Sequence, residues 1–167
     1  KQKNGAQPFL VGEDGLPPDA RLWAMLALAI GVGMASLDTA IANTALPAIA
    51  SELHTTPAAS VWIVNVYQLA MVATLLPFSA LGEIAGYRRV FISGMLLFTL
   101  ASLACALAWS LPSLVVARLF QGVGASAMMS VNTALLRALY PKHLLGRAFG
   151  NNALVVAVAF AIGPTAA

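Results

Sequence analysis

The chain has 167 residues, of which 60% are hydrophobic and only 9% are charged, and its formal net charge is +3 at pH 7. Ordinary globular proteins carry about 25% charged residues, so this composition excludes a water-soluble domain and makes lipid the solvent. The few basic residues are scattered between apolar blocks, which argues against a nucleic-acid-binding surface and favours a role as topology signals.

The first 22 residues are predicted to form a flexible cytoplasmic tail, because glycines and prolines interrupt any periodicity and charges of both signs alternate. This segment is longer and more acidic than the start of a signal peptide. The apolar block behind it is long enough to remain in the membrane as an uncleaved span. The absence of an initiator methionine suggests a trimmed chain.

Five apolar blocks of 20 to 24 residues follow the tail. They cover residues 23–46, 61–81, 90–109, 114–136 and 148–167. At about 1.5 Å per residue each block reaches roughly 30–36 Å, which matches the ~30 Å hydrocarbon core of a bilayer. Backbone amides at that depth must be satisfied within their own segment, and the alternation of a strand barrel is missing. The sequence therefore predicts an all-α integral membrane protein built as a transmembrane helix bundle.

The connections between the blocks predict the orientation of the chain. Lysine and arginine occur before the first block, between the second and third, and between the fourth and fifth, and are absent from the other two connections. Because basic loops stay cytoplasmic, we expect the N-terminus inside. The fifth block then runs outward and ends with the chain, so we expect an incomplete bundle.

Two formal charges lie inside the blocks, Asp38 in the first and Arg118 in the fourth. They lie about 12 and 6 Å from the outer ends of their spans, on the same side, so they are able to meet. A lone charge in the bilayer costs about 2.5–3.5 kcal/mol on insertion scales. One interpretation is a structural ion pair, and the other is a protonatable carboxylate in a transport path. The role in transport is favoured, because apolar residues of similar volume could replace an ion pair that served packing alone.

Amide side chains add polar groups at membrane depth. Asn65 and Gln68 share one face of the second block, Arg118 and Gln121 share one face of the fourth, and Asn43 lies in the first. For any single amide, an interhelical hydrogen bond worth about 0.6–2 kcal/mol is an alternative. Their number favours a polar cavity with Asn43, Asn65, Gln68 and Gln121 along a substrate path.

The residue types that catalysis or metal binding needs are scattered. Cys105 stands alone in an apolar block, and His54 and His143 lie in connections on opposite sides of the membrane. The sequence has no phosphate loop and no nucleophile elbow. We therefore expect no metal, no cofactor and no enzymatic activity, with an intramembrane enzyme as the weakest alternative.

Four stretches carry a family resemblance. They are LDTAIANTALP at residues 37–47, SALGEIAGYRR at 79–89, RLFQGVGA at 118–125, and Gly163 with Pro164. In order and position they resemble the first-helix, loop, fourth-helix and fifth-helix motifs of the drug:proton antiporter branch of the major facilitator superfamily, in its fourteen-span multidrug exporters. The resemblance runs from about Leu22 to the end and implies the first part of the N-terminal half of that fold.

The chain departs from these motifs at several positions. Ala40 replaces the usual hydroxyl residue of the first motif, Ala159 replaces a glycine of the fifth, and Glu83 replaces the aspartate of the loop motif. The resemblance implies a gating role for the loop residues, with a weakened latch to the other half of the transporter. Those residues are Gly82, Glu83, Gly86, Arg88 and Arg89. Gly163 and Pro164 are implied to form a hinge, because proline removes a backbone donor from the helix.

The resemblance implies a secondary active multidrug efflux transporter that exchanges protons for lipophilic cations by alternating access, with Asp38 and Arg118 coupling the proton. Its implied partners are those cations, protons, membrane lipid and the remaining helices of the transporter in the same or a separate chain, with no nucleic acid. The implied location is the bacterial cytoplasmic membrane. The alternative is a non-transporting remnant or a small accessory membrane subunit, which the length of the full reading frame would distinguish.

Overall fold

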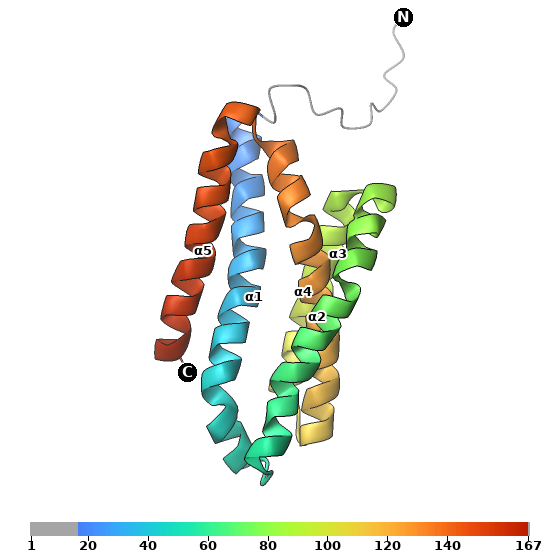
Figure 1. Cartoon of the computed structure of the whole chain (residues 1–167), viewed down its shortest axis with the longest axis vertical. Helices are drawn as coiled ribbons and strands as arrows, with labels where there is room; N and C mark the ends of the chain where they lie inside the picture. The colour runs from blue at the N-terminus through green and yellow to red at the C-terminus, as the bar shows by residue number, and fades with distance from the viewer. Residues whose placement is uncertain (1–16, 167) are drawn as a thin grey trace, which may run out of the picture.

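A computed structural model describes residues 17–166, which form five long α-helices (Figure 1). The elements are α1 (Pro18–Glu52), α2 (Pro57–Ala85), α3 (Tyr87–Ala106), α4 (Leu111–Leu139), the short 3-10 turn η1 (Lys142–Leu144) and α5 (Leu145–Ala166). This part of the chain contains no strand. All five α-helices are long and apolar enough to cross a membrane. The predicted all-α fold is confirmed.

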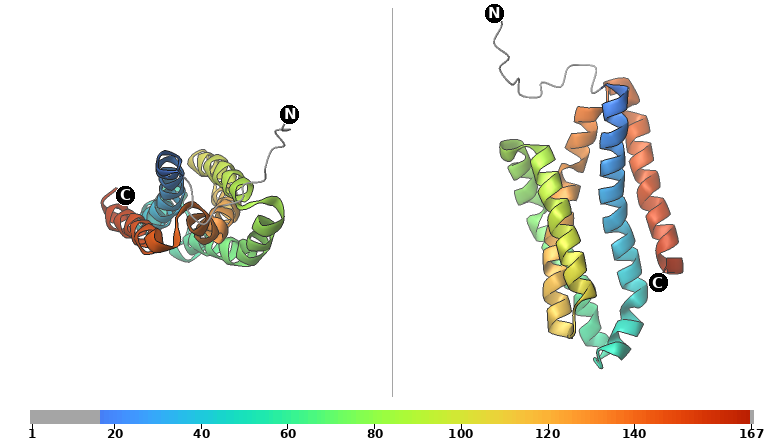
Figure 2. Two further views of the ribbon diagram at one scale, coloured as in Figure 1. Left: turned by 90° about the horizontal axis from the view of Figure 1, so that it is seen from above. Right: turned by 180° about the vertical axis from the view of Figure 1, so that it is seen from behind.

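Helix α4 lies at the centre of the bundle. Helices α2 and α3 pack along it, whereas α5 packs along α1. Seen from above, α4 separates the α1–α5 pair on one side from α2 and α3 on the other (Figure 2). The largest fully buried side chains include Phe98, Ile63 and Met128. The bundle therefore consists of a three-helix group and a helix pair, and α1 and α4 meet between them.

Helix α1 extends beyond the predicted span at both ends. It begins at Pro18, so the prediction that the tail runs to residue 22 is wrong for its last residues; residues 1–16 lie outside the described part. Proline suits a first helical position, because the amide it lacks has no partner there. At the other end α1 continues through Pro47 to Glu52, where a connection was predicted. Hydropathy marks the part of a helix in hydrocarbon, not its polar ends.

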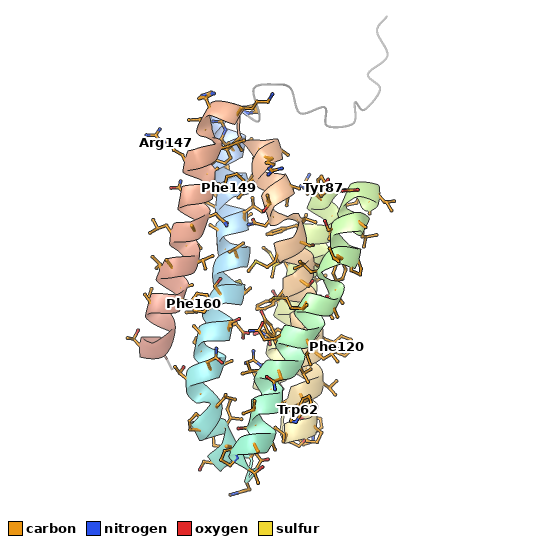
Figure 3. All side chains as sticks on the ribbon, in the orientation of Figure 1. Trp62, Tyr87, Phe120, Arg147, Phe149 and Phe160 are labelled. Atoms are coloured by element: carbon orange, nitrogen blue, oxygen red, sulfur yellow. The ribbon has the colours of Figure 1, made fainter. Side chains whose placement is uncertain are left out.

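The connections between the helices are short, and side chains cap the first turns of α2 and α4. Thr56 accepts a hydrogen bond from the amide of Ala59 at the start of α2, and Ser110 and Ser113 form a capping box at the start of α4. Figure 3 shows Tyr87 and Arg147 toward the end of the bundle where α1 begins, and Trp62 toward the opposite end. The basic connections thus gather at one end of the bundle.

Candidate functional site

Asp38 and Arg118 form an ion pair between α1 and α4. Nη1 of Arg118 lies 2.7 Å from Oδ2 of Asp38, and the two residues are 80 positions apart in the chain. The Arg118 side chain is 11% exposed and the Asp38 side chain 18%, so both charges are largely buried in the bundle. Asp38 lies near the middle of α1, because the helix continues past Pro47 to Glu52.

Gln121 supplies a second donor to the same carboxylate. Its Nε2 donates to Oδ1 of Asp38 at 2.9 Å, and the Gln121 side chain is fully buried. Arg118 and Gln121 are three positions apart, so they project from one face of α4. Each carboxylate oxygen therefore accepts one hydrogen bond, one from a cation and one from a neutral amide. The sequence analysis placed Gln121 on a substrate path and missed its bond to Asp38.

Helices α2 and α3 complete the surroundings of this pair. Tyr67 of α2 is buried and lies beside Thr39 of α1, near the charged groups of Asp38 and Arg118. Cys105 of α3 donates to Oε1 of Gln121 with an Sγ to Oε1 distance of 3.4 Å. Four helices therefore contribute side chains to one polar cluster, which we call the Asp38 cluster: Asp38, Thr39, Tyr67, Cys105, Arg118 and Gln121.

One donor of the Asp38 cluster has no protein partner. The Nε of Arg118 is buried and makes no hydrogen bond with any residue of the described part. A buried guanidinium nitrogen without a partner is costly. It is therefore a position at which an acceptor from a ligand or a water molecule would bind.

The glycines that follow Gln121 bring α4 close to its neighbours at this level. A Cβ on Gly122 would overlap the carbonyl oxygen of Tyr67, and one on Gly124 would lie 2.6 Å from the backbone nitrogen of Phe98. Close backbone approach is the common use of small residues between membrane helices. The RLFQGVG stretch therefore presents two polar side chains to α1 and two bare backbone positions to α2 and α3.

The other predicted substrate-path residues lie outside the Asp38 cluster. Asn43 is exposed and about 140° around α1 from Asp38. Asn65 and Gln68 are exposed on α2, whereas the neighbouring Tyr67 is buried. The described bundle thus brings Gln121 to Asp38 and leaves three amides on its surface. Their role in a substrate path stays a prediction.

The predicted loop motif forms a tight corner between α2 and α3. Gly86 is the single residue between these helices, and its φ of 95° is one that side-chain-bearing residues rarely adopt. Gly82 is buried, and a Cβ there would lie 2.8 Å from both Tyr87 and Val131. Both glycines therefore shape the corner.

The charged residues of this corner point outward. Glu83, Arg88 and Arg89 are exposed, and none pairs with another side chain of residues 17–166. Their part in gating stays a prediction.

The predicted hinge lies where α5 meets α1. Gly163 is buried against Ala40, and a Cβ at position 163 would overlap the Ala40 methyl group. Ala40 is the position at which the first motif loses its hydroxyl residue, so a larger side chain there would meet α5. Helix α5 continues through Pro164 to Ala166, and its action as a hinge stays a prediction.

Neither of two apolar grooves in the described bundle reaches the Asp38 cluster. One, of about 380 Å³, runs between α1 and α5. The other, of about 690 Å³, lies between α1, α3 and α4 toward the basic end. Among residues 17–166 no three His, Cys, Asp or Glu side chains gather closely enough to hold a metal ion.

Comparison with known proteins agrees with the family resemblance seen in the sequence motifs. The family profile of the Major Facilitator Superfamily matches residues 28–167. The chain is 55% identical over 157 residues to the "Uncharacterized transporter YebQ" of Escherichia coli (strain K12), a match that covers 94% of this chain and 34% of that protein.

Two further relatives carry more specific names. The "Riboflavin transporter RibZ" of Clostridioides difficile (strain 630) is 34% identical over 84% of this chain and 31% of its own length. The "Putative multidrug resistance protein MdtD" of Salmonella paratyphi B is 41% identical over 75% of this chain and 27% of its own length. The chain thus spans about a third of the length of the curated relatives it matches.

Proposed function

Because the chain belongs to the major facilitator superfamily and is an integral membrane protein, we propose that it forms part of a secondary active transporter that exports lipophilic cations in exchange for protons. The observation that carries this proposal is the Asp38 carboxylate, which accepts bonds from Arg118 and Gln121 in the middle of a membrane-length helix. Relatives named as transporters, including a multidrug resistance protein, support it.

We propose that Asp38 alternates between two states. With Arg118 and Gln121 in place, both oxygens of the ionised carboxylate are stabilised by donors at 2.7 and 2.9 Å. Both donors come from α4, so a movement of α1 away from α4 withdraws them together. A carboxylate that loses a neighbouring cation and remains out of water favours its protonated form. Relative movement of α1 and α4 therefore loads and releases a proton.

Competition for one carboxylate couples the proton to the substrate. A lipophilic cation that approaches Asp38 and a proton that binds to it neutralise the same charge, so the two exclude one another. Aromatic and methionine side chains accept the apolar body of such a cation. We propose that the remaining helices of the transporter complete this site, because the relatives are about three times as long as the chain.

The protein is proposed to act as a carrier rather than an enzyme, in the bacterial cytoplasmic membrane with its N-terminus inside. The orientation is supported by the basic residues, which gather at the end of the bundle where α1 begins. A relative named as a riboflavin transporter adds a planar heteroaromatic compound to the substrates worth testing.

Proton release by the full-length transporter tests the proposal. Purified protein is reconstituted into vesicles that hold a pH-sensitive dye, and a panel of lipophilic cations and riboflavin is added outside. We expect substrate-driven proton movement in the wild type and none in Asp38→Asn. Glu52→Gln removes an exposed carboxylate at the end of the same helix and should leave the signal unchanged. Normal exchange in Asp38→Asn would overturn the proposal.

A further inference from the structure

We propose that Cys105 is a positioning residue for the Asp38 cluster, and that its thiol fixes the orientation of the Gln121 amide that serves the carboxylate. This inference rests on the proposed function. Cys105 lies in α3, away from every motif that the sequence analysis identified. It is therefore a contribution to the site that the motifs of the chain do not contain.

The three side chains form a hydrogen-bonded chain from α3 to α1. The Cys105 thiol donates to Oε1 of Gln121 at 3.4 Å, and Nε2 of the same amide donates to Oδ1 of Asp38 at 2.9 Å. Gln121 is fully buried, so solvent cannot replace either partner. Both ends of the amide are satisfied only while the thiol and the carboxylate occupy their places.

The thiol matters because the two ends of an amide differ in character. A half-turn of the Gln121 amide would exchange its acceptor and its donors and direct Oε1 at Asp38. Oε1 of Gln121 would then face Oδ1 of the ionised Asp38 carboxylate, and two acceptors repel one another. A protonated carboxyl group could instead donate a hydrogen bond to Oε1. A donor at Cys105 holds the orientation that serves the charged carboxylate. Loss of the donor leaves Oε1 as a buried acceptor without a partner, and the amide is free to turn.

The other groups around Asp38 cannot take over this task. Tyr67 comes from α2 and contacts Thr39, and Arg118 already donates to the second carboxylate oxygen. Among the described residues of α3, only Cys105 makes a side-chain hydrogen bond with the Asp38 cluster. The thiol therefore makes the orientation of Gln121 depend on the packing of α3 against α4.

Three variants of the full-length transporter separate this role from simple packing. Cys105→Ser keeps a donor, Cys105→Ala removes it, and Cys105→Val removes it while filling the space. Loss of one buried hydrogen bond predicts that proton-coupled exchange falls about three- to tenfold in the alanine and valine variants. Cys105→Ser should keep the wild-type rate. Binding of a lipophilic cation in the absence of exchange and melting in detergent serve as controls for folding.

The decisive measurement is a double-mutant cycle with Gln121→Leu. If the thiol acts through the amide, Cys105→Ala lowers exchange in the wild type but changes nothing in the Gln121→Leu background. Additive effects, or equal rates in the alanine, valine and wild-type proteins, would overturn the inference. In either case Asp38→Asn reports separately on the proposed function, because its inactivity is required whether or not Cys105 contributes.

Discussion

Gly163 of α5 and Ala40 of α1 lie in direct contact, so close that a methyl group at position 163 would overlap that of Ala40. Ala40 lies two positions after Asp38, so the α1–α5 contact lies at the level of the Asp38 cluster. One face of α1 thus holds its polar contact with α4 while another packs on α5. Any change in spacing between α1 and α5 is transmitted to the same turn of α1.

Gly163→Ala should therefore destabilise the protein by about 1–3 kcal/mol, the usual cost of overpacking. Melting of the purified transporter in detergent measures the loss. Gly150→Ala in the same helix is the matched control, because no heavy atom lies within 4 Å of a Cβ at that position. Ala40→Gly in the Gly163→Ala background should restore stability. Equal melting of the two alanine variants would contradict the close contact.

Arg118→Ala should be more damaging than loss of both charges. The single variant leaves a largely buried carboxylate with one neutral donor, and breaking such a pair costs about 3–5 kcal/mol. The double variant Asp38→Asn with Arg118→Gln removes both charges and should recover stability. Melting in detergent and exchange in vesicles are compared for the two proteins.

Melting and exchange of the double variant distinguish a structural role of the ion pair from a role in transport. We expect the double variant to melt near the wild type and to exchange no protons. A double variant that exchanges normally would mean that the pair serves packing alone.

Gly86→Ala should weaken the corner between α2 and α3 without any clash. Its φ of 95° costs a side-chain-bearing residue about 1–3 kcal/mol, although no heavy atom lies within 4 Å of the added Cβ. Gly150→Ala is the control, because a Cβ at that position is equally uncrowded but the residue lies inside α5. Alanine is favoured by up to about 1 kcal/mol in a helix interior. The two variants should therefore shift the melting temperature in opposite directions, and shifts of the same sign would contradict this account.

The sequence predicts the helical fold and the principal charge pair, because both depend on local or one-dimensional properties. Block length sets the spans, and equal depth from the same surface brings Asp38 and Arg118 within reach. The ends of α1 are missed, since Pro18 and Pro47 lie within a helix whose polar ends have no hydrophobic signal. Hydropathy therefore locates the spans but not the full length of the helices.

The hydrogen bonds around Asp38 are only partly predictable. Gln121 shares a face with Arg118 at a spacing of three, and this signal was available, but the sequence analysis used it only to place Gln121 on a substrate path. Cys105 offers no such signal, because its contact depends on how closely α3 approaches α4. That approach is set by Gly94 and Gly124, whose backbones leave no room for a Cβ. Lateral packing of this kind cannot be read from the spacing of residues along one helix.

The 80 positions between Asp38 and Arg118 also bear on how the protein is made. At about 5–20 residues per second, synthesis of the intervening chain takes roughly 4–16 s. During that interval the nascent first helix carries Asp38, while Arg118 has not yet been synthesised. The first helix is therefore made before the arginine that neutralises its carboxylate, and the ion pair forms only once the fourth helix has been made.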